Sequence, residues 1–189
     1  MAKVDPDTYN AALTRNLAEA NNAILKRRAL IGLHSLHSAH GLDFFTVAAH
    51  ALYNDVLSHS MKLLETDPKP ASFWFLVRCD KASAKKAAKA RGVNLSDVAA
   101  IAARLKSIRN KTHFHIDKNA VLNPRAVWID AMIEGDQLGT ALEGAYAILS
   151  ELHFIKHGIR TALPDYDGTD AAKIVLAYKK VHPDAPIAI

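Results

Sequence analysis

Sulfur and long apolar runs are both scarce in this chain of 189 residues. The one cysteine, Cys79, excludes an internal disulfide and favours a reducing compartment such as the cytoplasm. No stretch approaches the roughly 18 consecutive apolar residues that a membrane-spanning helix needs. The first ten residues, MAKVDPDTYN, also lack the apolar centre of a signal peptide. We therefore expect a cytoplasmic protein that has no membrane partner.

The motifs of several enzyme classes are missing as well. The chain has no Gly-x-Ser-x-Gly nucleophile elbow, no phosphate-binding Gly-Lys-Ser/Thr loop and no dinucleotide-binding fingerprint. It also has no internal repeat and no Gly/Ser-rich linker at which a second domain would begin. Half of the residues are apolar, which is enough to bury a core. We expect residues 1–189 to form a single domain without a cofactor.

What the sequence does contain is helical periodicity, whereas alternating β-branched segments are almost absent. Asp5-Pro6 predicts the start of a long first helix that ends near Gly41. Asp43 caps a second helix, which ends before the proline break at residues 66–70. The residues expected to face inward on these two helices are Tyr9, Leu13, Leu17, Ala20, Ile24, Ile31, Phe44, Ala48, Leu52 and Val56.

Further helices follow in the second half of the chain. An alanine- and lysine-rich helix ends at Gly92, and Ser96 starts the next one. Residues 117–127 have the composition of a loop, residues 134–163 of another long helix, and Thr169 caps a short helix through Lys180. The helix that Ser96 starts should bury Val98, Ile101, Ala102, Leu105 and Ile108. The pattern predicts an all-α fold, an antiparallel bundle of long helices with short connections.

Positive charge is concentrated in one segment. Residues 78–118 contain eleven lysines and arginines against three aspartates, a net charge of +8, whereas the whole chain carries +5. Such a field attracts polyanions, and nucleic acid first among them. We expect RNA to be bound through Arg78, Lys81, Lys85, Lys89 and Arg104.

The sequence IRNKTHFHID, residues 108–117, carries the strongest chemical signal. The guanidinium of Arg109 is suited to holding a phosphate, and the imidazole of His115 can give or take a proton at neutral pH. On a regular helix these two side chains are displaced by about 120 degrees, so they would flank a groove between helices or between two copies of the chain. This interpretation requires both side chains to be presented to solvent. Asn110 would orient the substrate.

The order of arginine, asparagine, four residues and histidine resembles the signature of the HEPN superfamily of all-α proteins. RNKTHFHID is similar in more detail to the motif of AbiU-type abortive-infection proteins, and the resemblance covers about residues 40–155. It implies a HEPN-like, metal-independent endoribonuclease of a phage-defence or toxin-antitoxin type. RNA would be cleaved by 2′-hydroxyl attack in the cleft of a homodimer, under the control of an antitoxin or nucleotidyltransferase partner. The implied catalytic residues are Arg109, Asn110 and His115, with Lys111, His113 and Asp117 in support.

Two alternatives remain open from the sequence. HEPN-like proteins that bind nucleotides or RNA without cleaving them make a non-catalytic binding module the first alternative. The second is a histidine-rich, metal-dependent hydrolase, because His34, His37 and His40 recur at spacings of three. A complete metal site would need a ligand from another segment, and His50, His59, His153 and His157 are the candidates. No His-Glu-x-x-His run supports a metal site.

Overall fold

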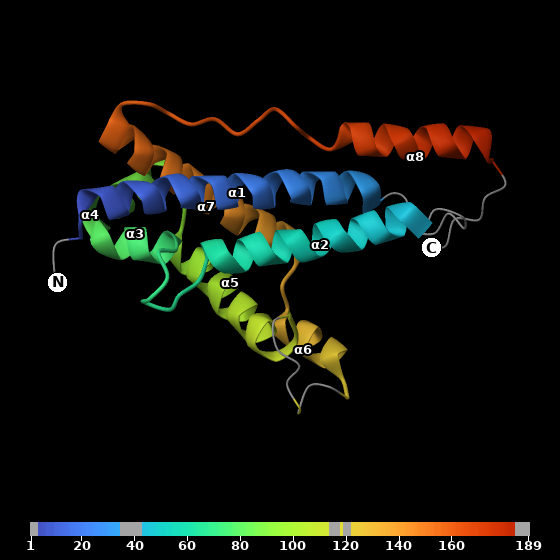
Figure 1. Ribbon diagram of the computed structural model, residues 1–189, viewed down its shortest axis with the longest axis horizontal. Helices are drawn as coiled ribbons and strands as arrows, with labels where there is room; N and C mark the ends of the chain where they lie inside the picture. Colours follow the sequence, from blue (N-terminus) through green and yellow to red (C-terminus); the bar gives the residue numbers. More distant parts are fainter. Residues whose placement is uncertain (1–3, 35–42, 114–117, 119–121, 184–189) are drawn as a thin grey trace.

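The computed structural model describes residues 4–34, 43–113, 118 and 122–183, and every regular element within these ranges is a helix. The predicted all-α fold is therefore confirmed. Two long helices, α1 (Pro6–His34) and α2 (Asp43–Leu63), lie side by side and antiparallel, and α7 (Gly135–His157) crosses behind them (Figure 1). Helix α1 packs against both α2 and α7, so it is the central helix of the bundle.

The shorter helices occupy the ends and one side of this frame. Helices α3 and α4 lie beside the start of α1, α5 and α6 extend away from the α1–α2 pair, and α8 lies at the opposite end (Figure 1). Their bounds are Phe73–Cys79 for α3, Lys81–Ala90 for α4, Leu95–Ile108 for α5, Pro124–Ala131 for α6 and Thr169–Val181 for α8.

A continuous apolar core joins α1 to α7. All five inward residues predicted for α5 are buried, which confirms that face, and so are four of the six predicted for α1. The prediction was wrong for Ile31 and Phe44, whose side chains are 52% and 75% exposed. Periodicity identifies the apolar face of a helix, but it does not say how far along that face a neighbouring helix reaches.

Several helix boundaries differ from the predicted ones. Helix α5 is capped by Asn94, whose side chain accepts the backbone N–H of Ser96, so Ser96 lies inside the helix and does not cap it. Part of the predicted loop is α6, because Asn123 caps it and Pro124 occupies its first turn. Helix α7 ends at Gly158, whose left-handed φ of 72° stops it before residue 163.

Helix α8 is held against α1 by a close backbone approach. A Cβ added to Gly32 would lie 2.2 Å from the carbonyl oxygen of Gly168, and one added to Gly168 would lie 2.2 Å from the carbonyl oxygen of Arg28. The guanidinium of Arg28 also donates to the carbonyl oxygen of Tyr166 at 3.0 Å. These contacts fix the segment that leads into α8, and only glycine fits at positions 32 and 168.

Candidate functional site

The predicted catalytic motif begins where α5 changes its winding. Ile108, the last residue of α5, is fully buried, and Arg109–His113 continue as a π-helical turn, η1. Single π-helical turns within α-helices are rare and are found frequently at functional sites. A π-helix closes its hydrogen bonds over five residues instead of four, so each residue rotates less about the helix axis than in an α-helix. The described part of the motif is therefore not the regular α-helix assumed for the predicted displacement of about 120 degrees between Arg109 and His115, and His115 itself lies outside the described residues.

Arg109 makes an ion pair with Glu65, which lies just after the end of α2. The Glu65 side chain is only 7% exposed, whereas that of Arg109 is 27% exposed. The Nε of Arg109 also donates to Oδ1 of Asn110 at 3.1 Å. The guanidinium is thus oriented by two partners while part of its side chain still faces solvent.

The connection between α2 and α3 holds the Glu65 carboxylate in place. Oε1 of Glu65 accepts the backbone N–H of Asp67 at 3.0 Å, and its backbone carbonyl accepts the hydroxyl of the buried Ser72 at 2.6 Å. A carboxylate with these fixed contacts limits the rotamers that Arg109 can adopt. Sequence analysis missed Glu65, because nothing in the stretch LLETDP links it to a motif 44 residues away.

The remaining motif residues are described only in part. Asn110 and Lys111 are exposed on η1. The backbone of His113 belongs to the same turn, but its side chain and the whole of residues 114–117, with His115 and Asp117, lie outside the described residues. The predicted pairing of Arg109 with a histidine therefore stays a prediction.

The basic residues predicted to bind RNA lie on three helices. Lys81, Lys85 and Lys89 are exposed on α4, where Asp80 caps the helix through the backbone N–H of Ser83. Arg78 lies on α3 and lines a cavity between the start of α1, α3 and the end of α7. Arg104 of α5 donates to the carbonyl oxygen of Met132 at 2.8 Å and to Oε1 of Gln137 at 3.1 Å. The three α4 lysines therefore form one surface, and Arg104 is engaged elsewhere.

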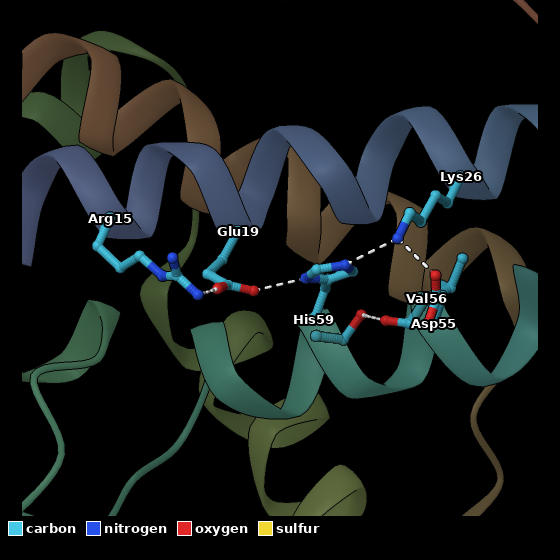
Figure 2. Close-up of polar contacts among 7 residues, drawn as sticks. Arg15, Glu19, Lys26, Asp55, Val56 and His59 are labelled. Atoms are coloured by element: carbon cyan, nitrogen blue, oxygen red, sulfur yellow. Dashed lines mark hydrogen bonds and ion pairs between the residues drawn. The ribbon is translucent and has the colours of Figure 1, made fainter.

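A second polar cluster links α1 to α2 around His59 (Figure 2). Nδ1 of His59 lies 2.5 Å from the buried Glu19 carboxylate, and Nε2 lies 3.0 Å from Nζ of Lys26. An ammonium group only donates, so Nε2 accepts from Lys26 and Nδ1 carries the proton that is donated to Glu19. Lys26 also contacts Asp55 at 2.5 Å, and Arg15 contacts Glu19 at 2.7 Å.

Electrostatics favour the charged form of Glu19 in this cluster. Burial alone would raise the pKa of its carboxyl, but the hydrogen bond from His59 and the neighbouring charges of Lys62 and Arg15 outweigh burial and lower the pKa. A glutamate beside a histidine is also an arrangement that activates a general base. Here Nε2 faces Lys26, and His59 lines neither of the two main cavities formed by the described residues, so the cluster joins the two helices.

Two of the histidines proposed as metal ligands, His153 and His157, lie together on α7, with their ring centres 4.6 Å apart. In the described part of the chain, no group of three or more histidine, cysteine, aspartate or glutamate side chains is placed to hold a metal ion. Both ring nitrogens of His59 have partners, and Nδ1 of His153 lies 2.9 Å from the carbonyl oxygen of Ile159. The side chains of His34, His37 and His40 lie outside the described residues.

Comparison with known proteins found no match for this chain. No family model, no curated protein and no solved structure matches it. Within the described ranges, no helix combines the length and the apolar character needed to cross a membrane.

Proposed function

We propose that this protein is a metal-independent endoribonuclease of the HEPN type, acting in phage defence or as the toxin of a toxin-antitoxin pair in the cytoplasm. The observation that carries the proposal is the placement of Arg109. This residue begins a π-helical turn, is held by the buried carboxylate of Glu65, and keeps 27% of its side chain exposed. Such a preoriented guanidinium can grip a phosphate without first being ordered, which reduces the entropic cost of binding.

The reaction we propose is an internal transfer within RNA. The 2′-oxygen attacks the adjacent phosphorus, and the new bond forms as the bond to the 5′-oxygen breaks. The proton of the 2′-hydroxyl goes to a base, and the departing 5′-oxygen receives a proton. His115 carries out one of these transfers, while Arg109 neutralises the charge that develops on the phosphate. Asn110 orients the substrate, and Lys111, His113 and Asp117 support the site.

The three exposed lysines of α4, Lys81, Lys85 and Lys89, are the RNA contacts in this proposal. Exposed ammonium groups attract phosphates from a distance and do so without sequence preference. We also propose that two copies of the chain associate so that their motifs share one cleft. Light scattering would then give a mass of twice 20.6 kDa.

RNA cleavage in the presence of a chelator is the direct test. We expect purified protein to cut 5′-labelled RNA in EDTA, to leave a 2′,3′-cyclic phosphate, and to spare a strand with 2′-deoxyribose at the cleavage position. His115→Ala should abolish cutting, whereas His50→Ala, which changes an exposed histidine on α2, should not.

Other outcomes would contradict the proposal. RNA that is retained but never cut would identify a non-catalytic binding module. Cleavage that the chelator abolishes would instead favour the metal-dependent hydrolase. Cleavage that survives His115→Ala at the level of the wild type would remove the residue on which the mechanism depends.

A further inference from the structure

A cavity of about 760 Å³ lies where the start of α1, helix α3 and the end of α7 meet. Its volume falls within the range of about 300–1,000 Å³ that is typical of small-molecule sites. Its lining is mainly apolar, and the apolar residues are Val4, Pro6, Pro68, Phe75, Leu152 and Ile155. None of the predicted motif residues lines it, so it is separate from the proposed ribonuclease site.

The most unusual polar group in this cavity is Arg78. Its Nη2 atom is shielded from solvent and has no hydrogen-bond partner within the described residues. Arginine keeps its charge in proteins, so an unpartnered buried guanidinium nitrogen is costly unless an acceptor is supplied. The adjacent Asp80 does not fill this role: its carboxylate accepts the backbone N–H of Ser83 at 3.0 Å and makes no hydrogen bond with Nη2 of Arg78.

The neighbouring groups are suited to an anion rather than to a cation. Nζ of Lys156 lies 5.9 Å from the centre of the Tyr9 ring, at the same cavity. Burial, together with the charges of Asp80 and Cys79, raises the pKa of Tyr9 to about 12, so its hydroxyl stays a neutral donor at physiological pH. Arg78 and Lys156 against Asp80 leave the lining with one net positive charge.

We propose that this cavity binds a small monoanion with an apolar body, an acyl or aryl carboxylate. Because Nη2 of Arg78 is shielded when the cavity is empty, the guanidinium would turn toward the ligand. The carboxylate would then accept hydrogen bonds from Arg78, whose planar guanidinium matches its two oxygens, and would be attracted by Lys156. The acyl chain or ring would lie against Phe75, Leu152 and Ile155. One net positive charge matches one negative charge, which favours a carboxylate over the dianion of a phosphate monoester.

Calorimetric titration of the full chain with four small probes tests the proposal. We expect octanoate and 4-phenylbutyrate to bind, and octanol, which has the same chain length as octanoate but no charge, to bind at least tenfold more weakly. Octyl phosphate should bind no more tightly than octanoate. Loss of a charge-assisted hydrogen bond in Arg78→Gln should weaken octanoate binding about tenfold.

Two further variants keep the test decisive even if Arg78→Gln does not fold. Lys156→Gln changes an exposed side chain at the cavity and should weaken octanoate binding several-fold, whereas Lys86→Gln removes an equivalent charge from the exposed face of α4 and should not. Equal affinities for octanol and octanoate would overturn the proposal, as would tighter binding of octyl phosphate. Failure of all four probes to bind at millimolar concentration would also refute it.

Discussion

Removing either partner of the Arg109–Glu65 ion pair should destabilise the protein, but by unequal amounts. Arg109→Ala leaves the Glu65 carboxylate uncompensated at a position where its side chain is only 7% exposed. Breaking a buried pair in this way costs about 3–5 kcal/mol, a large part of the roughly 5–15 kcal/mol by which proteins are stable. Glu65→Gln instead leaves a guanidinium that is 27% exposed and can turn toward water, so we expect a cost of about 1–2 kcal/mol.

Urea unfolding followed by far-ultraviolet circular dichroism measures both costs. The double variant Arg109→Ala with Glu65→Gln should be more stable than Arg109→Ala alone, because no buried charge is left without a partner. A double-mutant cycle should return a coupling energy of about 1–3 kcal/mol. Arg125→Ala, which changes an exposed arginine on α6, is the matched control and should stay within about 0.5 kcal/mol of the wild type.

Equal losses for Arg109→Ala and Glu65→Gln would refute this reasoning, and so would a coupling energy near zero. The result also bears on the activity test. If Arg109→Ala is strongly destabilised, its inactivity says nothing about catalysis. Arg109→Lys, which keeps the charge but loses the planar fork, is then the better probe of phosphate binding.

Three further predictions concern other parts of the molecule. His59 helps to lower the pKa of the Glu19 carboxyl below 4.5, so this carboxylate stabilises the fold above that pH, and the contribution is lost as the pH falls through the lowered pKa. In Glu19→Gln, the free energy of unfolding should therefore depend less steeply on pH in the acid range. An unchanged pH dependence would contradict this. Gly32→Ala places a Cβ against the carbonyl oxygen of Gly168, so it should lower the free energy of unfolding by about 1–3 kcal/mol and speed proteolysis of the segment between α7 and α8. Equal proteolysis rates for the variant and the wild type would argue against close docking of α8 on α1. Burial raises the pKa of the Cys79 thiol, so iodoacetamide should react slowly at pH 7 and faster as the pH rises; a rate at pH 7 equal to that of the unfolded chain would count against burial.

Strict apolar spacing explains why parts of the fold were predictable from sequence. Val98, Leu105 and Ile108 recur on one face of α5, and burial of that face against the rest of the core follows directly from the pattern. Helix α6 was predictable in principle, since Asn123-Pro124 is the same kind of start signal as Asp5-Pro6. Its length of eight residues is too short for periodicity to be recognised.

The ion pair between Arg109 and Glu65 could not be predicted from the sequence, for a different reason. Glu65 and Arg109 lie at the ends of separate helices, and an ion pair between distant segments leaves no periodic trace in one sequence. The π-helical turn was hidden as well, because residues 109–113 have no composition that distinguishes a π-helix from an α-helix. Residue types alone therefore suggest a chemical hypothesis for the candidate site, whereas the ion pair and the turn that hold Arg109 depend on tertiary packing.

The docking of α8 on α1 also constrains when this protein can complete its fold. Gly32 meets Gly168 across 136 positions of sequence, and α1 receives α7 only after residue 135 has been made. During synthesis on the ribosome, α1 and α2 can pair early, but the part of α1 that packs against α7 and α8 stays uncovered until the last third of the chain has been made. A nascent chain stalled before that point would present an unfinished surface to chaperones and proteases.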